Sequence, residues 1–524
     1  MKNLNIKYLA AAMFWLAFSA CDTEDDLRQD IIDSTPNPFQ PTSPPTVSGG
    51  EADITNYVAI GASITAGMMD AALYNNGQKF SYPNLLAAQL SQASGQNFVQ
   101  PNINSDRGFN VNFNDISQAR NVATFGRLAL DVAAQRPDVL FIPGDVITDY
   151  SGPTPVHNYG VPGARVVDLG FNGYGEANVF FGRFDTSGTT SILQDALAAG
   201  GTFHTLWAGG NDILGWVSGG GVGPDGDVTP GAELNPSALT GTATFQAAFN
   251  GVLSAVAANS KVAVLNLPNI LATPLLQAVP YNAIPLDDAT ATQLNGAFGG
   301  LNAALDGLAA NQLITQAEAD ARKVVYSAGA NSILAVDDVL ENLGPKFDIL
   351  VGAGAISAEQ RAALEPYVQS RPLTANDFVL LSAGLVLNTL ADPSNPQSLI
   401  GIVVPIADRL ILQADEVVRA ATRLATFNGI IATEVAANDN AILVDVHTVF
   451  NNVTAAHSTG GFEVDGIMVT ADFAPTGVFS TDAIHPNPRG QGLIVNEIIR
   501  SMNAGFGASI PEVSVSNLPG VVLK

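Results

Sequence analysis

Ser63 is the residue whose neighbours most favour nucleophilic chemistry in this sequence. It follows the apolar run of residues 57–60, whose β-branched and aromatic side chains are typical of a buried strand. Gly61 and Gly67 flank the serine and permit a sharp turn with a close backbone approach. A serine in such a turn is usually only a turn or capping residue. The hypothesis of a nucleophile therefore needs a general base elsewhere in the chain.

A candidate base lies near the other end of the chain, in the stretch Asp482-Ala483-Ile484-His485-Pro486. A serine hydroxyl is a weak nucleophile, so it needs an imidazole to accept its proton and a carboxylate to orient that imidazole. The spacing in this stretch lets Asp482 orient His485. The alternative interpretation is a capping aspartate followed by a surface histidine.

Two further stretches could supply hydrogen-bond donors to a developing oxyanion. Residues 158–164 contain Gly160 and Gly163, and residues 206–213 place Asn211 after the apolar start of a strand. Acyl transfer puts negative charge on a carbonyl oxygen, which preorganised backbone N–H groups and amide side chains stabilise in a site closed to water. Taken alone, each stretch would be interpreted as a turn.

Together the four stretches resemble the SGNH, or GDSL-type, family of serine hydrolases. They occur in the order of that family's four blocks, and the four letters of its name correspond to Ser63, Gly163, Asn211 and His485. The sequence departs from the family at Ala62, where the family has an aspartate. No step of the expected chemistry uses that carboxylate.

The resemblance implies a role for each residue. Ser63 would be the nucleophile, His485 the general base and acid, and Asp482 the group that orients it. The backbone N–H groups of Ser63 and Gly163, with the side chain of Asn211, would form the oxyanion hole. Gly160 is the alternative to Gly163, because both lie in one short turn.

The elements that would position these residues indicate an α/β fold. Apolar runs near residues 57, 203, 262 and 442 alternate with helical patterns, which predicts a doubly wound, mostly parallel sheet. Such sheets place ligands at the carboxyl ends of their strands, where Ser63 and Asn211 are expected to lie. The hydrolase domain is assigned to residues 53–300 and 412–510.

Residues 301–411 read as a helical insertion between the last two predicted strands. Capping boxes at Thr315-x-x-Glu318 and Ser357-x-x-Gln360 indicate helix starts within it. One interpretation is an apolar lid or acyl-chain pocket, and the other is a structural elaboration.

The N-terminus resembles that of an exported bacterial lipoprotein. Residues 1–20 read as a signal peptide, with lysines, an apolar run and small residues before Cys21, the only cysteine of the chain. This resemblance implies lipidation of Cys21 and anchoring to the outer membrane, and ordinary signal-peptide cleavage is the alternative. Residues 21–52 form an acidic and then proline-rich tether, and the acidic run resembles the surface-export signal of Bacteroidetes lipoproteins.

The composition of the chain disfavours some classes of function. The chain has 524 residues, 47% of them hydrophobic and 13% charged, so it can bury a large core. A formal charge of −26 disfavours binding to nucleic acid. The histidines at 157, 204, 447 and 457 show no metal-ligand spacing, and nothing implies a cofactor. The sequence does not indicate an oligomeric state.

We therefore expect serine-dependent hydrolysis of carboxylic esters through an acyl-enzyme, with apolar acyl esters favoured by the hydrophobic insertion. The family resemblance also permits removal of acetyl groups from polysaccharide or small esters. A catalytically inactive surface binding lipoprotein with the same fold is the third possibility.

Overall fold

The computed structural model describes residues 46–109, 126–131, 136–139, 144–232, 235–473 and 476–520. The predicted signal peptide, Cys21 and most of the predicted tether lie outside the described residues. The compact unit that holds the site starts at Val47. There Ser48 bridges to Ser509 and Glu51 N donates to Phe506 O at 2.8 Å, so the packed chain begins before the expected end of the tether at residue 52.

A five-stranded parallel sheet forms the centre of the fold. Its strand order is β13-β6-β5-β1-β4, and every neighbouring pair is parallel. The strands are β1 (Tyr57–Gly61), β4 (Asn158–Gly160), β5 (Phe203–Trp207), β6 (Lys261–Leu265) and β13 (Ala441–Val444). The four strands predicted from apolar runs are confirmed, and β4 is an addition to them.

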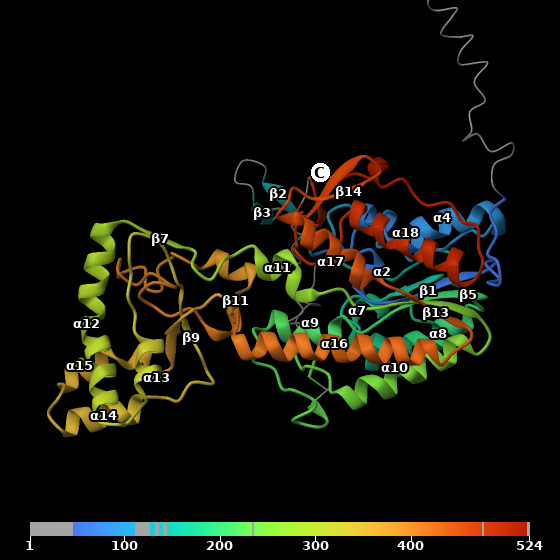
Figure 1. The fold of residues 1–524 in the computed structure, drawn as a ribbon. Coiled ribbons are helices and arrows are strands. Elements are labelled where there is room, and N and C mark those ends of the chain that lie inside the picture. The colour runs from blue at the N-terminus through green and yellow to red at the C-terminus, as the bar shows by residue number, and fades with distance from the viewer. Residues whose placement is uncertain are drawn as a thin grey trace, which may run out of the picture. The chain divides into compact units, whose positions relative to one another are not determined.

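Helices flank this sheet on both faces (Figure 1). Helices α4 (Tyr82–Ser94) and α18 (Pro488–Gly505) pack together on one face, and α10 (Thr242–Ala257) and α16 (Ala414–Ala436) pack together on the other. The stacked rings of Phe245 and Phe427, with centroids 3.7 Å apart, join α10 to α16. The predicted fold class, an α/β fold with a parallel sheet between two layers of helices, is thus confirmed.

Two helices separated by a short break lie between residues 75 and 94. A short helix, α3 (Asn75–Lys79), ends before α4 begins at Tyr82. Pro83 lies in the first turn of α4, where a missing N–H costs no helical hydrogen bond.

A second apolar core gathers residues between Ile284 and Ile411. The predicted boundary at residue 301 falls inside α12, so the segment starts earlier, and it contains short strands as well as helices. Both predicted helix starts are confirmed, because the side chains of Thr315 and Ser357 cap α13 and α15. The full capping box forms only at Ser357, since the Glu318 side chain binds Arg322 instead. The elements of this part are β7 (Ile284–Leu286), α12 (Asp288–Ala310), α13 (Gln316–Arg322), β8 (Gly329–Asn331), β9 (Leu334–Val336), α14 (Gly344–Gly352), α15 (Ala358–Ala363), β10 (Ser370–Pro372), β11 (Phe378–Val379) and β12 (Ile411–Leu412).

The remaining elements are mostly short. Within the described residues, no helix combines the length and apolar character needed to cross a membrane. These elements are α2 (Ser63–Ala66), β2 (Leu128–Asp131), β3 (Arg136–Val139), α5 (Val166–Leu169), α6 (Tyr174–Ala177), α7 (Val179–Gly182), α8 (Ile192–Ala198), α9 (Asn211–Ser218), α11 (Pro274–Gln277), α17 (Val446–His457), β14 (Phe462–Val464), β15 (Ile467–Phe473) and β16 (Gly477–Phe479).

Candidate active site

Ser63 lies at the carboxyl end of the buried strand β1 and begins the short helix α2. A side chain at Gly61 would collide with Thr65 Oγ1, and Gly67 ends α2 with a φ of 85°. Both positions therefore need glycine, as the sequence suggested. The Ser63 side chain is held at a tight strand-to-helix turn, and the residue is 7% exposed.

Asp482 and His485 form a buried hydrogen-bonded pair in the loop between β16 and α18. His485 Nδ1 lies 2.7 Å from Asp482 Oδ2. Because an ionised carboxylate only accepts, Nδ1 carries the proton of the neutral ring and Nε2 keeps a lone pair for a second partner. A Ser-His-Asp triad requires this arrangement, with Nδ1 bound to the carboxylate and Nε2 able to accept the serine proton.

Four donors converge on the carboxylate of Asp482. Oδ2 also accepts from Ala71 N at 2.8 Å, and Oδ1 accepts from Ile484 N at 3.0 Å and His485 N at 2.8 Å. Burial by itself would raise the pKa of Asp482, but the His485 ring and these hydrogen bonds outweigh it and lower the pKa to about 2. The carboxylate therefore stays ionised at neutral pH.

The two candidate glycines of the second stretch have different environments. Gly160 N donates to Asn158 Oδ1 at 2.8 Å, and a side chain at Gly160 would collide with Ala66 N, in the last residue of α2. Gly163 has a φ of 82°, and its amide N–H donates no hydrogen bond within the described part of the chain. Gly163 is thus better suited than Gly160 to donate its N–H to a ligand.

Asn211 begins α9 directly after strand β5 and its connecting turn. Its Nδ2 donates to Ala164 O at 2.8 Å, which uses one of the two N–H bonds of the amide. The next residue, Asp212, accepts from Val166 N at 2.9 Å, and burial raises the pKa of Asp212 to about 7. Asn211 and Asp212 together fix the turn that contains Gly163.

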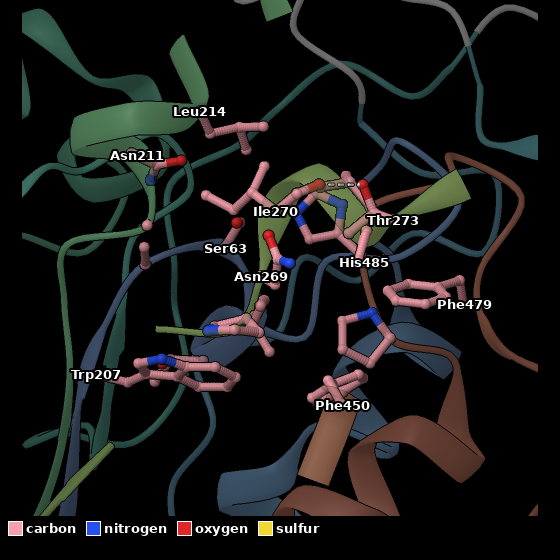
Figure 2. Close-up of a pocket in the computed structure, with 18 of the residues that line it drawn as sticks. Ser63, Trp207, Asn211, Leu214, Asn269, Ile270, Thr273, Phe450, Phe479 and His485 are labelled. Carbon is pink, nitrogen blue, oxygen red and sulfur yellow. Dashed lines mark hydrogen bonds between the residues drawn. The ribbon is translucent and has the colours of Figure 1, made fainter. Parts of the chain in front are cut away.

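Ser63, Asn211 and His485 line one pocket, which encloses about 840 Å³, part of it open to solvent. Figure 2 shows Ser63 between Asn211 and His485 in that view. No hydrogen bond between Ser63 and His485 is present among the described contacts, and such bonds are often long before substrate binds. Gly163 is not among the residues that line the pocket.

The pocket is built entirely from the part of the chain assigned to the hydrolase domain. Its lining comes from residues 62–65, 207–214, 268–273, 450–454 and 479–486. None of the lining residues belongs to the insertion at 301–411. The expectation that the insertion supplies an acyl-chain pocket therefore does not hold for this pocket.

Other polar groups of the chain, two aspartates and the remaining histidines, have structural partners. The side chains of Asp225 and Asp227 both bind Arg423 at 2.7 Å, which suits an ion pair. Within the described ranges, no group of three His, Cys, Asp or Glu side chains could hold a metal ion. The remaining histidines contact Val99 (His157), Ser260 (His204), Leu267 (His447) and Asp472 (His457).

Several residues at the site were missed by the sequence reasoning. Asn269 lines the pocket and follows β6 at the same edge of the sheet as Ser63, so the rule that ligands bind at strand carboxyl ends could have found it. Phe450 and Phe479 also line the pocket, but nothing local distinguishes them from core aromatics.

Comparisons with protein-family models, with curated proteins and with solved structures found no match to this chain. The functional conclusion therefore depends on the geometry of the site and on the four sequence stretches.

Proposed function

We propose that this protein is a serine hydrolase of the SGNH type that cleaves carboxylic esters through an acyl-enzyme. The observation that carries the proposal is the convergence of three candidates, distant in sequence, on one pocket. Ser63 and Asn211 line it beside His485, whose Nδ1 is hydrogen-bonded to Asp482 at 2.7 Å. A structural role for Asp482 and His485 would not require an apolar pocket that also contains a serine at a strand end.

The proposed first half-reaction forms the acyl-enzyme. Ser63 Oγ bonds to the ester carbonyl carbon while its proton passes to His485 Nε2. Asp482 holds the ring and stabilises the imidazolium. The tetrahedral oxyanion accepts hydrogen bonds from Ser63 N and the second N–H of Asn211, with Gly163 N, which lies outside the pocket lining, as the third donor that the family resemblance implies. Its collapse breaks the bond to the alcohol oxygen, which takes the proton from His485.

The second half-reaction releases the acid. Water attacks the acyl carbonyl while His485 accepts its proton, and the same donors hold the second oxyanion. Collapse returns the proton to Ser63 Oγ and frees the carboxylic acid. Asp482 stays ionised throughout, which agrees with its lowered pKa.

The lining of the pocket supports apolar acyl esters as the substrate class. Trp207, Leu214, Ile270 and Phe479 present apolar surface to the cavity beside Ser63. His485 is the one ionisable side chain among the described lining residues. A polysaccharide substrate would need polar partners along the site, so this lining favours an acyl chain larger than acetyl.

Hydrolysis of p-nitrophenyl butyrate by the wild-type chain and by Ser63→Ala tests the proposal. We expect turnover by the wild type and a loss of at least about 10³-fold in kcat for Ser63→Ala. Ser187→Ala is the control, because Ser187 is exposed and does not line the pocket. Equal activity of Ser63→Ala and wild type would refute the assignment of the nucleophile.

We also propose export and lipid anchoring through Cys21, which lies outside the described residues. The support is the apolar run and the small residues before this cysteine. Cys21→Ser should move the protein from the membrane fraction to the soluble fraction of expressing cells. Retention in membranes by Cys21→Ser would contradict the anchor.

A further inference from the structure

Two aromatic side chains stand together in the pocket, away from the oxyanion side. Phe450 belongs to α17 and Phe479 ends β16, and their ring centroids lie 5.8 Å apart at an angle of 41°. Both residues line the pocket while remaining largely buried, at 6% and 5% exposed. In Figure 2 they lie on the opposite side of the view from Asn211, with Ser63 between.

The backbone around this aromatic pair is tied to the loop that carries the base. Phe479 bridges to Pro486, and Ser480 N donates to His485 O at 2.8 Å. Helix α17 is capped by Asp445, whose side chain accepts from Thr448 N, and the helix packs on β15 and α18. The pair is therefore part of the packed core next to His485 and does not belong to a separate covering segment.

Two of the three polar side chains near the pair, those of Thr273 and Thr454, direct their donors away from a ligand, and Asn451 is the third polar residue of this part of the lining. Thr273 Oγ1 donates to Ile270 O at 2.7 Å, and Thr454 Oγ1 donates to Phe450 O at 3.0 Å. These hydroxyl protons are used within the protein, so the wall offers mainly carbon surface. A neutral hydrocarbon chain fits such a surface, because a charged or hydroxylated group would lose its hydration without compensation.

We propose that Phe450 and Phe479 form the end wall of the acyl-chain site and set the longest chain that the enzyme accepts. This inference rests on the proposed ester hydrolysis and deepens it by assigning the residues that determine specificity. The insertion at 301–411 contributes no lining residue, so it does not set this limit.

The wall predicts how rate depends on chain length. Each methylene that enters the pocket should raise kcat/KM about fourfold through apolar burial, until the chain meets the two rings. A chain that is too long must leave part of itself in water or displace a packed ring, and a rigid pocket of this kind discriminates by roughly 10-fold or more at its limit.

The test is kcat/KM for p-nitrophenyl esters from acetate to palmitate, measured with wild type and with Phe450→Ala, Phe450→Trp and Phe479→Ala. We expect both alanine variants to move the optimum to longer chains and to raise the ratio of decanoate to butyrate activity by roughly 10-fold. Phe450→Trp should lower that ratio. Phe450→Leu and Phe479→Leu serve where an alanine variant does not fold, and should shift the optimum in the same direction by less.

Phe298→Ala is the matched control, because Phe298 is 3% exposed in the second apolar core and makes edge-to-face contacts with Tyr326 and Tyr367, outside the pocket lining. It should cost comparable stability and leave the chain-length profile unchanged. If the profiles of the Phe450 and Phe479 variants match that of Phe298→Ala, the end wall is wrong while the hydrolase proposal stands. The variants could instead change the preferred length of the alcohol, measured with acetate esters of longer alcohols, and leave the preferred acyl chain unchanged. That result would also overturn the assignment to the acyl chain. Absence of Ser63-dependent hydrolysis in the wild type would instead refute the proposed function itself.

Discussion

Asp70 accepts two hydrogen bonds from Thr481, one from the backbone N at 3.0 Å and one from Oγ1 at 2.7 Å. These residues lie in different parts of the site, because Asp70 follows the nucleophile turn and Thr481 precedes Asp482. Asp70 N in turn donates to Ser480 Oγ at 3.0 Å. With the bond from Ala71 N to Asp482, these contacts fix the segment of the base relative to the segment of the nucleophile.

Asp70→Ala should therefore lower kcat by disturbing the position of Asp482 and His485. A displacement of about 1 Å at a catalytic pair can cost about 100-fold in rate, so we expect a loss between about 10- and 100-fold. Asp70 also accepts from Tyr74 Oη at 2.6 Å and lies 3.6 Å from Arg127, so the variant will lose stability as well.

Two measurements separate positioning from a general loss of stability. Activity should be assayed well below the melting temperature of each variant, and Asp70→Asn should recover part of the rate because its carbonyl can still accept from Thr481. An unchanged kcat in folded Asp70→Ala would show that the contact does not position the base.

Strands β1 and β6 were predictable because each contains a continuous apolar run that is buried on both faces, at residues 57–60 and 262–265. Strand β4 (Asn158–Gly160) was not, because its three residues include asparagine and glycine and owe their conformation to pairing with β1.

The site was predictable where a short local pattern carries the chemistry, as in the stretch that contains Asp482 and His485. The contact between Asp70 and Thr481 joins positions 411 residues apart, and no local pattern indicates it. The same holds for the pairing of Phe450 with Phe479, because a pocket wall and an ordinary core use the same aromatic residues.

Asn211→Ala should lower kcat by about 10²- to 10³-fold if the amide stabilises the oxyanion. The effect should appear in kcat more than in KM, because the charge develops only in the transition state. Asn302→Ala is a suitable control, since that amide also bridges backbone groups, donating to Val324 O at 2.8 Å, but lies in the second core. A normal kcat for Asn211→Ala would remove this residue from the oxyanion hole.

The lowered pKa of Asp482 predicts how stability depends on pH. Its folded-state pKa of about 2 lies below the ordinary value of 3.8, so the ionised form stabilises the fold above pH 3.8. This contribution is about 2 kcal/mol and should be lost as pH falls from 3.8 toward 2.

Asp482→Asn should lack this pH-dependent contribution to the free energy of unfolding. We expect the free energy of unfolding, from denaturant titrations, to fall more steeply in the wild type than in Asp482→Asn between pH 4 and pH 2. Parallel curves over that range would show that Asp482 is not held in its ionised form by His485 and Ala71.

The most direct test of the account is covalent labelling of the purified full chain with a fluorophosphonate, followed by peptide mapping. The account predicts one adduct on Ser63, no adduct in Ser63→Ala, and labelling slowed by at least about 100-fold in His485→Ala, since the base activates the serine. An adduct on another serine, or no adduct on a folded wild-type chain, would contradict the claim that Ser63 is an activated nucleophile.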